Sequence, residues 1–343
     1  MIILGIETSC DETSASLIKT DAKKEKVDVL SNIIASSLSL HAKTGGVIPE
    51  VAAREQVKYM LPVIQKALAN LKNPQQEVDA IAVTTGPGLI GSLLVGVETA
   101  RTLSFVWEKP IYSVNHLFGH IYANFIDENP NKSNDIRFPS IALIVSGGHT
   151  DLVLLKNHKD TTWLGGTRDD AAGEAFDKTG RLLSLPYPAG PQIEILAEKV
   201  TKDIYRFPRP LIGSNDYDFS FSGLKTAVLR EVQKTKQLDD ETISNICCSL
   251  QAAIFDILIK KTFKAAEEFR VKSILLGGGV AANQALRKRF ELEILNQKSK
   301  IGFFVPSKIL CTDNAAMIAT AGFFNNEPVS WRDISANPEA YFD

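Results

Sequence analysis

The stretch Ile2-Ile-Leu-Gly-Ile-Glu-Thr-Ser-Cys-Asp-Glu-Thr-Ser-Ala-Ser-Leu-Ile-Lys19 predicts a β-hairpin near the start of the chain. Two apolar runs flank a turn, Glu7 to Thr13, that is rich in hydroxyls and carboxylates. The same order of runs returns over Ile141–Leu155, around the turn Ser146-Gly-Gly-His-Thr150. Two hairpins of one kind predict two related lobes.

A second repeated pattern supports this duplication. Val78–Val83 is followed by the glycine turn Gly86-Pro-Gly-Leu-Ile-Gly91 and a helical stretch, and Ile274–Leu276 is followed by Gly277-Gly-Gly279 and the helix-like Ala281–Glu291. Strand, glycine turn and helix therefore occur in both halves, which indicates a duplicated α/β fold.

The glycine turns suggest an anion site. A turn between a strand and a helix exposes backbone N–H groups near the positive helix end. Neither turn matches the P-loop or the GxGxxG fingerprint, so a tight turn is the expected role of either one alone. Their joint occurrence favours a nucleotide held between the two lobes.

Composition sets limits on partners and location. The 343 residues suffice for about two domains, and the net charge of −2 means that a nucleic-acid partner must be met by local patches. The first residues lack a signal peptide's basic region, and no run approaches the length of a membrane span, so we expect a cytoplasmic protein without a membrane partner. The four cysteines show no CxxC spacing and are interpreted as reduced thiols.

His116 and His120 stand four residues apart and would share one face of a helix. Such a pair can bind a divalent metal if a further ligand, usually a carboxylate, comes from elsewhere. Two core or capping histidines are the alternative. Leu117 occupies the position of the glutamate in a metalloprotease motif, which argues against that chemistry.

Three carboxylates are candidates for metal binding or catalysis. Asp11 and Glu12 in the first turn can orient a metal, act as a base, or simply be solvated. Asp313 lies where a helix begins, so helix capping is its default role, and its alternative role as third ligand cannot be derived from spacing.

Together these motifs resemble the TsaD family, tRNA threonylcarbamoyladenosine synthesis proteins once described as glycoproteases, over essentially the full chain. The matching stretches are Leu4–Thr13, Gly45–Glu50, Thr85–Leu89, His116–His120, Val145–Thr150, Asp177–Gly180, Phe219–Lys225, Gly277–Asn283 and Cys311–Ala315.

The resemblance implies an actin-like (ASKHA) α/β fold of two duplicated lobes with the active site in the interlobe cleft. The lobes are expected over 1–135, with 306–343 packing back on it, and over 136–305, with a helical insertion at about 167–240. The implied reaction transfers the threonylcarbamoyl group from threonylcarbamoyl-AMP to N6 of adenosine 37 in tRNAs reading codons that begin with A, and releases AMP. Implied partners are a TsaB-like paralogue and a TsaE-like ATPase.

Residue roles follow from the same resemblance. His116, His120 and Asp313 would bind one divalent metal, Fe²⁺ or Zn²⁺, and Asp11 and Glu12 are candidates for catalysis. The expected substrate-binding residues are Ile144, Val145, Ser146, Gly147, Gly148, Asp177, Gly190, Glu194 and Asn283.

Some positions depart from the family pattern or point to other functions. Glu194 replaces an expected aspartate, and Gln56 stands where histidine is frequent. Basic residues available for RNA are Arg206, Arg209 and Arg287-Lys288-Arg289, although a solvated helix face is the expected role of the last three. The alternatives are an actin-like kinase or ATPase, which would place Asp-x-Gly in the first turn, and a non-catalytic scaffold subunit, which has no need of a complete metal site.

Overall fold

A computed structural model describes residues 1–21, 23, 25–126, 135–200, 202–235, 238–297, 300–325 and 327–342. The chain divides into two compact units, Met1–Asp135 with Pro306–Asp343, and Ile136–Val305. Residues 127–134, just before the lobe boundary expected at 135, lie outside the described residues.

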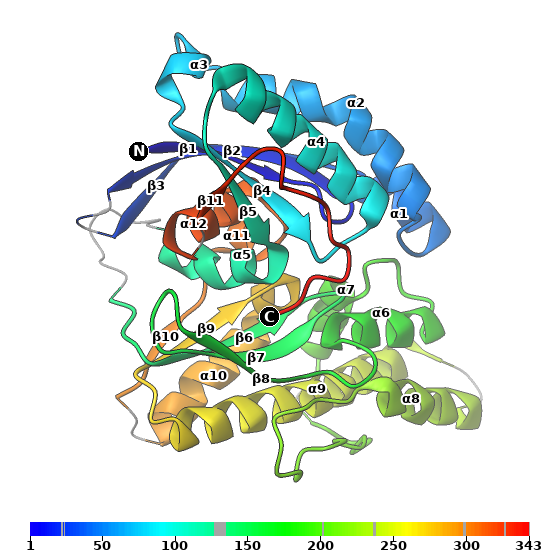
Figure 1. The fold of residues 1–343 in the computed structure, drawn as a ribbon. Helices are drawn as coiled ribbons and strands as arrows, with labels where there is room; N and C mark the ends of the chain where they lie inside the picture. Colours follow the sequence, from blue (N-terminus) through cyan, green and yellow to red (C-terminus); the bar gives the residue numbers. More distant parts are fainter. Residues whose placement is uncertain are drawn as a thin grey trace. The chain divides into compact units, whose positions relative to one another are not determined.

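The first unit is built on a six-stranded sheet (Figure 1). Its first three strands are antiparallel, and β1, β4 and β5 are mutually parallel. The sheet order is β11 (Pro328–Val329), β5 (Ile111–Asn115), β4 (Ala80–Gly86), β1 (Ile2–Glu7), β2 (Glu12–Asp21) and β3 (Lys26–Ser36).

The second unit repeats this plan in a five-stranded sheet. Strands β6, β7 and β8 form an antiparallel meander, and β6, β9 and β10 are mutually parallel. The order is β10 (Gly302–Phe304), β9 (Ser273–Gly277), β6 (Ser140–Val145), β7 (Thr150–Leu155) and β8 (Thr161–Gly166). Both predicted hairpins are confirmed, and the matching strand orders confirm the duplication.

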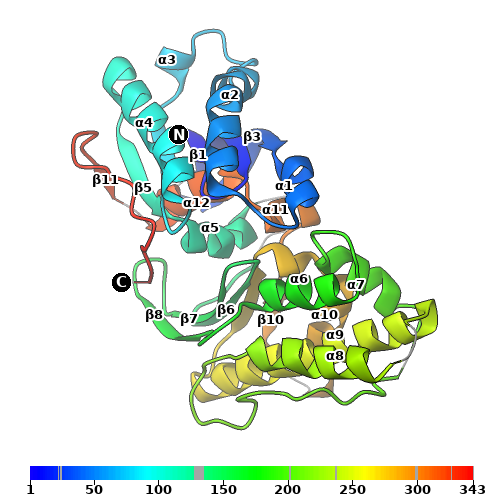
Figure 2. The same ribbon diagram turned by 90° about the vertical axis from the view of Figure 1, so that its right-hand side faces the viewer.

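Helices cover both faces of the first sheet (Figures 1 and 2). α2 and α4 pack on one face, where Met60 and Val97 join Leu4 and Ile6 in a core cluster. α5 and α12 pack on the other face. The helices of this unit are α1 (Leu38–Thr44), α2 (Pro49–Ala67), α3 (Pro74–Glu77), α4 (Ile90–Trp107), α5 (His116–Tyr122), α11 (Lys308–Cys311) and α12 (Ala315–Asn325), with a 3₁₀ turn at Ala123–Phe125.

The buried face of α2 differs from the one that the helical spacing of Val57, Leu61 and Ile64 would indicate. Pro49 opens the helix, but Val57 and Leu61 are 65% and 64% exposed. The side that packs inward carries Met60 and the fully buried Gln56. The polar Gln56 is therefore buried, whereas its apolar neighbour Val57 is exposed.

The long helix α9 forms the centre of the second unit. Its 29 residues, Asp240–Glu268, are long and apolar enough to cross a membrane by length and composition, but 67% of its most apolar window is buried within the protein. Such burial is typical of a core helix. The other helices of this unit are α6 (Ala172–Leu182), α7 (Gly190–Ala197), α8 (Ser222–Lys234) and α10 (Gln284–Asn296), with a 3₁₀ turn at Gly279–Ala282. The four cysteines are free thiols, as expected.

Candidate metal centre

The two histidines lie on α5, which directly follows strand β5. Asn115 caps this helix by accepting a hydrogen bond from Leu117 N through Oδ1. His116 and His120 are both buried, and their ring centroids lie 4.7 Å apart. The i,i+4 spacing therefore does place both imidazoles on one side of a helix.

Asp313 reaches the histidines because a neighbour performs the capping. We expected a helix cap at Asp313, but Asn314 takes that role: its Oδ1 accepts from Met317 N, and its Nδ2 donates to Leu310 O and Thr312 O. The Asp313 carboxylate is therefore available to face α5. Helix α12 begins at Ala315, whose N–H donates to Ser14 Oγ on β2.

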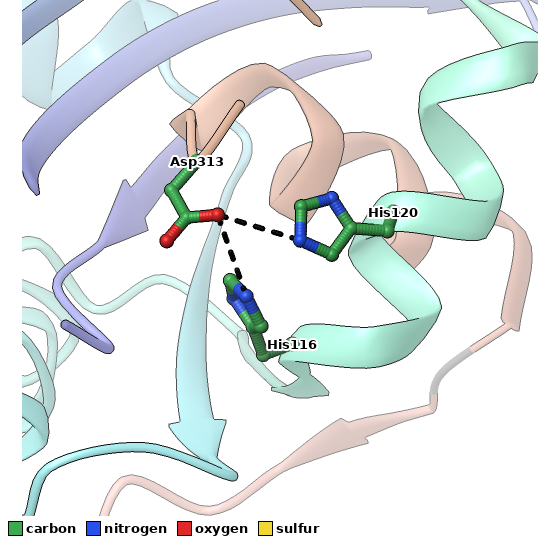
Figure 3. Close-up of side chains that lie close together, drawn as sticks. All are labelled: His116, His120 and Asp313. Atoms are coloured by element: carbon green, nitrogen blue, oxygen red, sulfur yellow. Dashed lines mark ion pairs between the residues drawn. The ribbon is translucent and has the colours of Figure 1, made fainter. Parts of the chain in front are cut away.

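These three residues form the candidate metal centre (Figure 3). Asp313 Oδ1 lies 3.5 Å from His116 Nε2 and 3.4 Å from His120 Nε2. One ligand atom from each residue falls within 4.8 Å of the others, so a single cation can reach all three. Two imidazoles and one carboxylate are a donor set found at both zinc and non-haem iron sites.

A close helix contact supports this arrangement. Gly119 lies between the two histidines, and a Cβ built there would lie 2.7 Å from Ile318 Cδ1 and 3.2 Å from Met317 Cγ on α12. Only a residue without a side chain lets α5 approach α12 so closely. That approach brings the histidine side of α5 toward Asp313.

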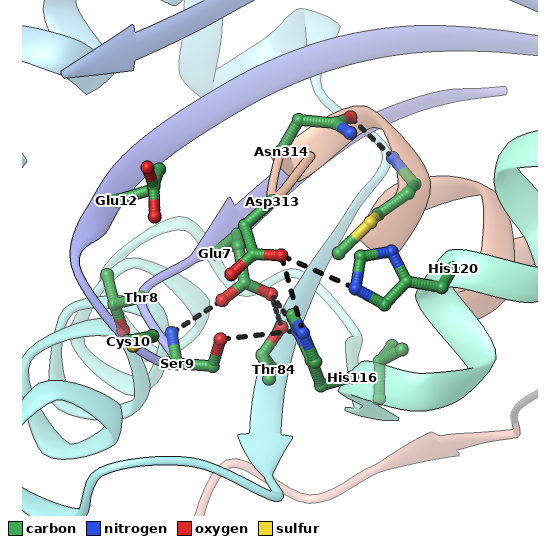
Figure 4. A network of polar contacts seen from close by, with 12 residues as sticks. Glu7, Thr8, Ser9, Cys10, Glu12, Thr84, His116, His120, Asp313 and Asn314 are labelled. Carbon is green, nitrogen blue, oxygen red and sulfur yellow. Dashed lines mark hydrogen bonds and ion pairs between the residues drawn. The ribbon is translucent and has the colours of Figure 1, made fainter. Parts of the chain in front are cut away.

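Glu7 contacts His116 at the ring nitrogen opposite the one that faces Asp313 (Figure 4). This fully buried carboxylate lies 3.1 Å from His116 Nδ1 and accepts hydrogen bonds from Ser9 N and Thr84 Oγ1. A carboxylate on one ring nitrogen fixes the tautomer and points the other nitrogen at the metal. Sequence reasoning missed this role, because Glu7 was assigned only to a polar turn.

Charge and burial shift the pKa values of His116 and His120 in opposite directions. Burial pulls the pKa of His116 down, but the charges of Glu7 and Asp313 outweigh it and raise the pKa to about 9. The pKa of His120 is lowered, mainly by burial, with repulsion from His116 added. His120 Nδ1 has no hydrogen-bond partner among the residues that the structure describes, and Nε2 has only its 3.4 Å ion-pair contact with Asp313 Oδ1. A buried imidazole with so few partners beside a carboxylate fits a bound cation.

The predicted catalytic acids sit beside this centre. Glu12 opens β2, and its Oε1 accepts from Ser36 Oγ at 3.1 Å. Burial, with the nearby charges of Asp313 and Asp11, raises the pKa of Glu12 well above its usual range. Burial likewise raises the pKa of the Cys10 thiol.

Gln56 holds the turn that carries these acids. Its Nε2 lies 3.3 Å from Thr8 O, 2.9 Å from Cys10 O and 3.1 Å from Glu12 O. One buried amide thus contacts carbonyls along the whole turn. Gln56, which stands where histidine is frequent in the family, therefore stabilises this turn.

Two amides of the first glycine turn are bonded within the unit. Gly88 N donates to Pro338 O, and Leu89 N donates to Ser9 O at 2.8 Å. These bonds agree with the tight turn that is expected of either glycine turn alone.

In the second unit, the predicted substrate residues gather at the carboxyl ends of β6 and β9. Ile144 pairs with Gly277, so the turn Ser146–Gly148 and the turn Gly277–Gly279 leave adjacent parallel strands at one edge. Gly173 N at the start of α6 donates to Ser146 O, which adds a helix end to the same edge. Ligands of open α/β sheets bind at this edge.

Four further candidates surround that edge, each with a structural partner. Asp177 on α6 accepts from Ala189 N, next to Gly190 at the start of α7, and burial raises the pKa of Asp177. Glu194 accepts from Gln284 N at 2.6 Å. Asn283 caps α10 through Leu286 N and donates to Gln251 Oε1.

Most of the named basic residues are engaged inside the second unit. Arg209 pairs with Asp203 and Asp256, Arg289 pairs with Asp256, and Arg287 Nε donates to Ala281 O. A tRNA phosphate would have to compete with these contacts. They support a packing role more than an RNA-binding role for these three residues.

Comparison with known proteins places the chain in a family. A family model described as TsaD, tRNA N6-adenosine threonylcarbamoyltransferase, matches residues 28–320. The chain belongs to the TsaD family. Among curated TsaD relatives named tRNA N6-adenosine threonylcarbamoyltransferase, one from Symbiobacterium thermophilum is 47% identical over 323 residues, 94% of this chain and 91% of the relative. Another, from Listeria welshimeri, is 45% identical over 341 residues, 98% of this chain and 95% of the relative.

Solved structures bear on the fold of this TsaD member. HypF of T. kodakarensis aligns with a TM-score of 0.58 at 15% identity, covering 94% of this chain and 47% of that one. A likeness at this identity concerns the fold alone, and it agrees with the duplicated actin-like α/β class predicted from sequence. The placement of the active site in an interlobe cleft stays a prediction.

Proposed function

We propose that this chain is a tRNA N6-adenosine threonylcarbamoyltransferase that uses threonylcarbamoyl-AMP as donor and N6 of adenosine 37 as acceptor. The full-length likeness to TsaD proteins supports the activity. The observation that carries the chemical part of the proposal is the convergence of His116, His120 and Asp313.

The reaction is an acyl transfer. The N6 amine attacks the carbonyl carbon of the threonylcarbamoyl group, the bond from that carbon to the phosphate oxygen breaks, and AMP leaves with the electron pair while the amine loses a proton. An exocyclic adenine amine is a weak nucleophile, so positioning and activation of the electrophile contribute more than a strong base.

The donor set fits one divalent cation, Fe²⁺ or Zn²⁺, held by His116, His120 and Asp313. When bound, such a cation would supply Lewis-acid stabilisation for carbonyl or phosphate oxygens. Glu7 keeps the Nδ1–H of His116 engaged, so that Nε2 presents its lone pair on the Asp313 side. The ligand set is therefore oriented by residues of this chain alone.

Residues of the second unit are assigned to the adenylate. Gly147 and Gly148 present backbone without side chains at the edge of the sheet, and a Cβ at either position would meet no atom within 4 Å. The carboxylates of Asp177 and Glu194 suit ribose hydroxyls. Asp11 and Glu12, in the turn beside the ligand set, are the candidates to accept the amine proton.

Three other functions are less well supported by the site. A kinase or ATPase needs its first turn for phosphate, but Glu7 is committed to Ser9, Thr84 and His116. A serine hydrolase would place Ser and its orienting acid on opposite ring nitrogens, whereas Ser9 and Glu7 both contact Nδ1 of His116. A scaffold subunit has no use for a complete ligand set.

Reconstitution tests the activity. The purified chain, a TsaB-like protein, a TsaE-like ATPase and threonylcarbamoyl-AMP labelled in the threonyl group are incubated with a tRNA that reads an A-initial codon. We expect label at adenosine 37 after nuclease digestion and mass spectrometry. A tRNA with the same body and a guanosine at that position is the control, and absence of label in the first tRNA would contradict the proposal.

Metal analysis tests the site separately. Protein purified with and without oxygen should contain about one iron or zinc per chain. His120→Ala should lose the metal. His158→Ala should keep it, because His158 lies in the second unit, where its ring packs edge-on against Phe138. Equal metal contents in both variants would remove the three-residue site from the proposal.

A further inference from the structure

We propose that the C-terminal segment Asn337–Phe342, called the strap below, positions α5 and thereby both histidine ligands. The inference rests on the proposed metal function of α5, but its first test does not require a metal. In Figures 1 and 2 the strap is the last part of the red chain.

The segment before the strap anchors it to the first unit. Ile334 is 3% exposed and belongs to the core cluster between the sheet, α2 and α4. Trp331 O accepts from Arg101 Nε at 3.1 Å, and the Trp331 ring lies 4.9 Å from that of Phe105 on α4. The chain thus enters the strap from a fixed point.

The strap first crosses the turn after β4. Asn337 N donates to Thr85 O at 2.7 Å, and Pro338 O accepts from Gly88 N at 3.3 Å. A Cβ at Gly86 would lie 1.8 Å from Asn337 O and 3.1 Å from Ala340 Cβ. The glycine is therefore required by the strap's approach, since the backbone atom in the way cannot move as a side chain can.

The strap then reaches the start of α5. Asn115 Nδ2 donates to Tyr341 O at 2.8 Å, and the Phe342 ring packs edge-on against Phe118 at 5.4 Å. The other end of the Asn115 carboxamide accepts from Leu117 N. One side chain thus joins the strap to the first turn of the ligand helix, directly beside His116.

These contacts make Asn115 and the strap positioning elements rather than ligands. α5 has only seven residues, too few to be stable by its own hydrogen bonds, so its orientation depends on what packs against it. Gly119 fixes one side against α12, and the strap fixes the beginning of the helix. Loss of the strap should loosen the helix locally and lower metal affinity.

Hydrogen exchange of the metal-free protein is the first test. Two variants disrupt the contacts of the strap. One is a chain ending at Ala336, which keeps Trp331 and Ile334, and the other is full-length Gly86→Ala. In both, amides of peptide 115–122 should exchange about tenfold faster, as expected for the loss of one or two supporting hydrogen bonds. Tyr341→Ala is the matched control, because it keeps the carbonyl that accepts from Asn115.

The pattern of exchange decides between local positioning and general stability. Faster exchange confined to α5 and its neighbouring turn supports the strap. Unchanged exchange of 115–122 in the truncated chain would overturn it, and so would equal acceleration in strands β1 and β2, which would reduce the strap to a contributor to stability.

Metal affinity is the second test, measured by competition between the protein and a chromophoric chelator for Zn²⁺. The truncated chain and Gly86→Ala should each bind about tenfold more weakly than wild type, and the double variant should be no weaker than either alone. Additive losses would mean that the two changes act independently and would contradict one shared strap. If the wild-type chain binds no Zn²⁺, the metal proposal fails, while the exchange experiment still decides the strap.

Discussion

Glu7 Oε2 lies 3.1 Å from His116 Nδ1, although 109 residues separate the two in the chain. The carboxylate is fully buried at the end of β1, and its other contacts are Ser9 N and Thr84 Oγ1. Glu7 therefore has no solvent to face, and its charge is balanced within this network. The pair selects one orientation of the His116 ring.

Glu7→Gln should weaken metal binding by about 10- to 100-fold, the usual effect of removing a residue that orients a ligand. The glutamine has nearly the same shape, so the fold should survive. Zn²⁺ affinity measured by chelator competition checks this, with Glu50→Gln on the exposed start of α2 as the control. Equal affinities for wild type and Glu7→Gln would show that the pair does not orient the ligand.

Metal binding should release a proton near neutral pH. In the metal-free protein the pKa of His116 is raised to about 9, so below that pH the ring holds a proton that a metal must displace, whereas His120, with its lowered pKa, has none to lose. The apparent affinity should therefore rise about tenfold per pH unit up to about pH 9 and then level off. Calorimetry with Zn²⁺ in two buffers of different protonation enthalpy measures the released protons directly. A binding constant that stays flat between pH 6 and 8 would contradict this account.

Gln56→Leu should destabilise the protein by at least about 2 kcal/mol. The leucine fits the buried position but removes the Gln56 donor from the carbonyls of Thr8 and Glu12, whereas Cys10 O keeps its hydrogen bond from Ser92 Oγ, and each buried unsatisfied carbonyl costs about 1–3 kcal/mol. Urea unfolding followed by circular dichroism is the measurement. Val57→Leu on the adjacent exposed position should change stability by less than about 0.5 kcal/mol, and similar effects of both variants would dismiss the turn-holding role.

Gly119→Ala should disturb the packing of α5 on α12, because the new Cβ overlaps Ile318 Cδ1. Overpacking of this kind typically costs about 1–3 kcal/mol. Ile318→Val deletes the overlapping atom, so the double variant should recover much of the loss in thermal stability and metal content. A double variant as unstable as the sum of both singles would place the strain elsewhere.

The sequence predicted most of what depends on local pattern. The two hairpins, the repeated strand and glycine turn, and the helix carrying His116 and His120 all follow from short-range periodicity. The roles of Glu7 and Gln56 do not, since a buried carboxylate or amide is defined by partners more than 40 residues away. The hydrophobic pattern even favoured Val57 and Leu61 over Gln56 for the buried side of α2.

Asp313 shows the same limit in another form. Spacing alone gave it a capping role, because aspartate and asparagine are both good caps and stand side by side at the start of α12. The choice between them depends on which side chain a histidine pair attracts, and that pair lies about 200 residues earlier.

The return of the chain into the first unit has a consequence for biosynthesis. The ribosome completes the strands β1 to β5 and then the whole second unit before it makes Asp313, the last candidate ligand, and α12, which packs on β1. A nascent chain therefore carries a histidine pair without its carboxylate through most of translation. We expect metal loading to follow release of the polypeptide. Chains that terminate before Asp313 should be unable to retain the ion.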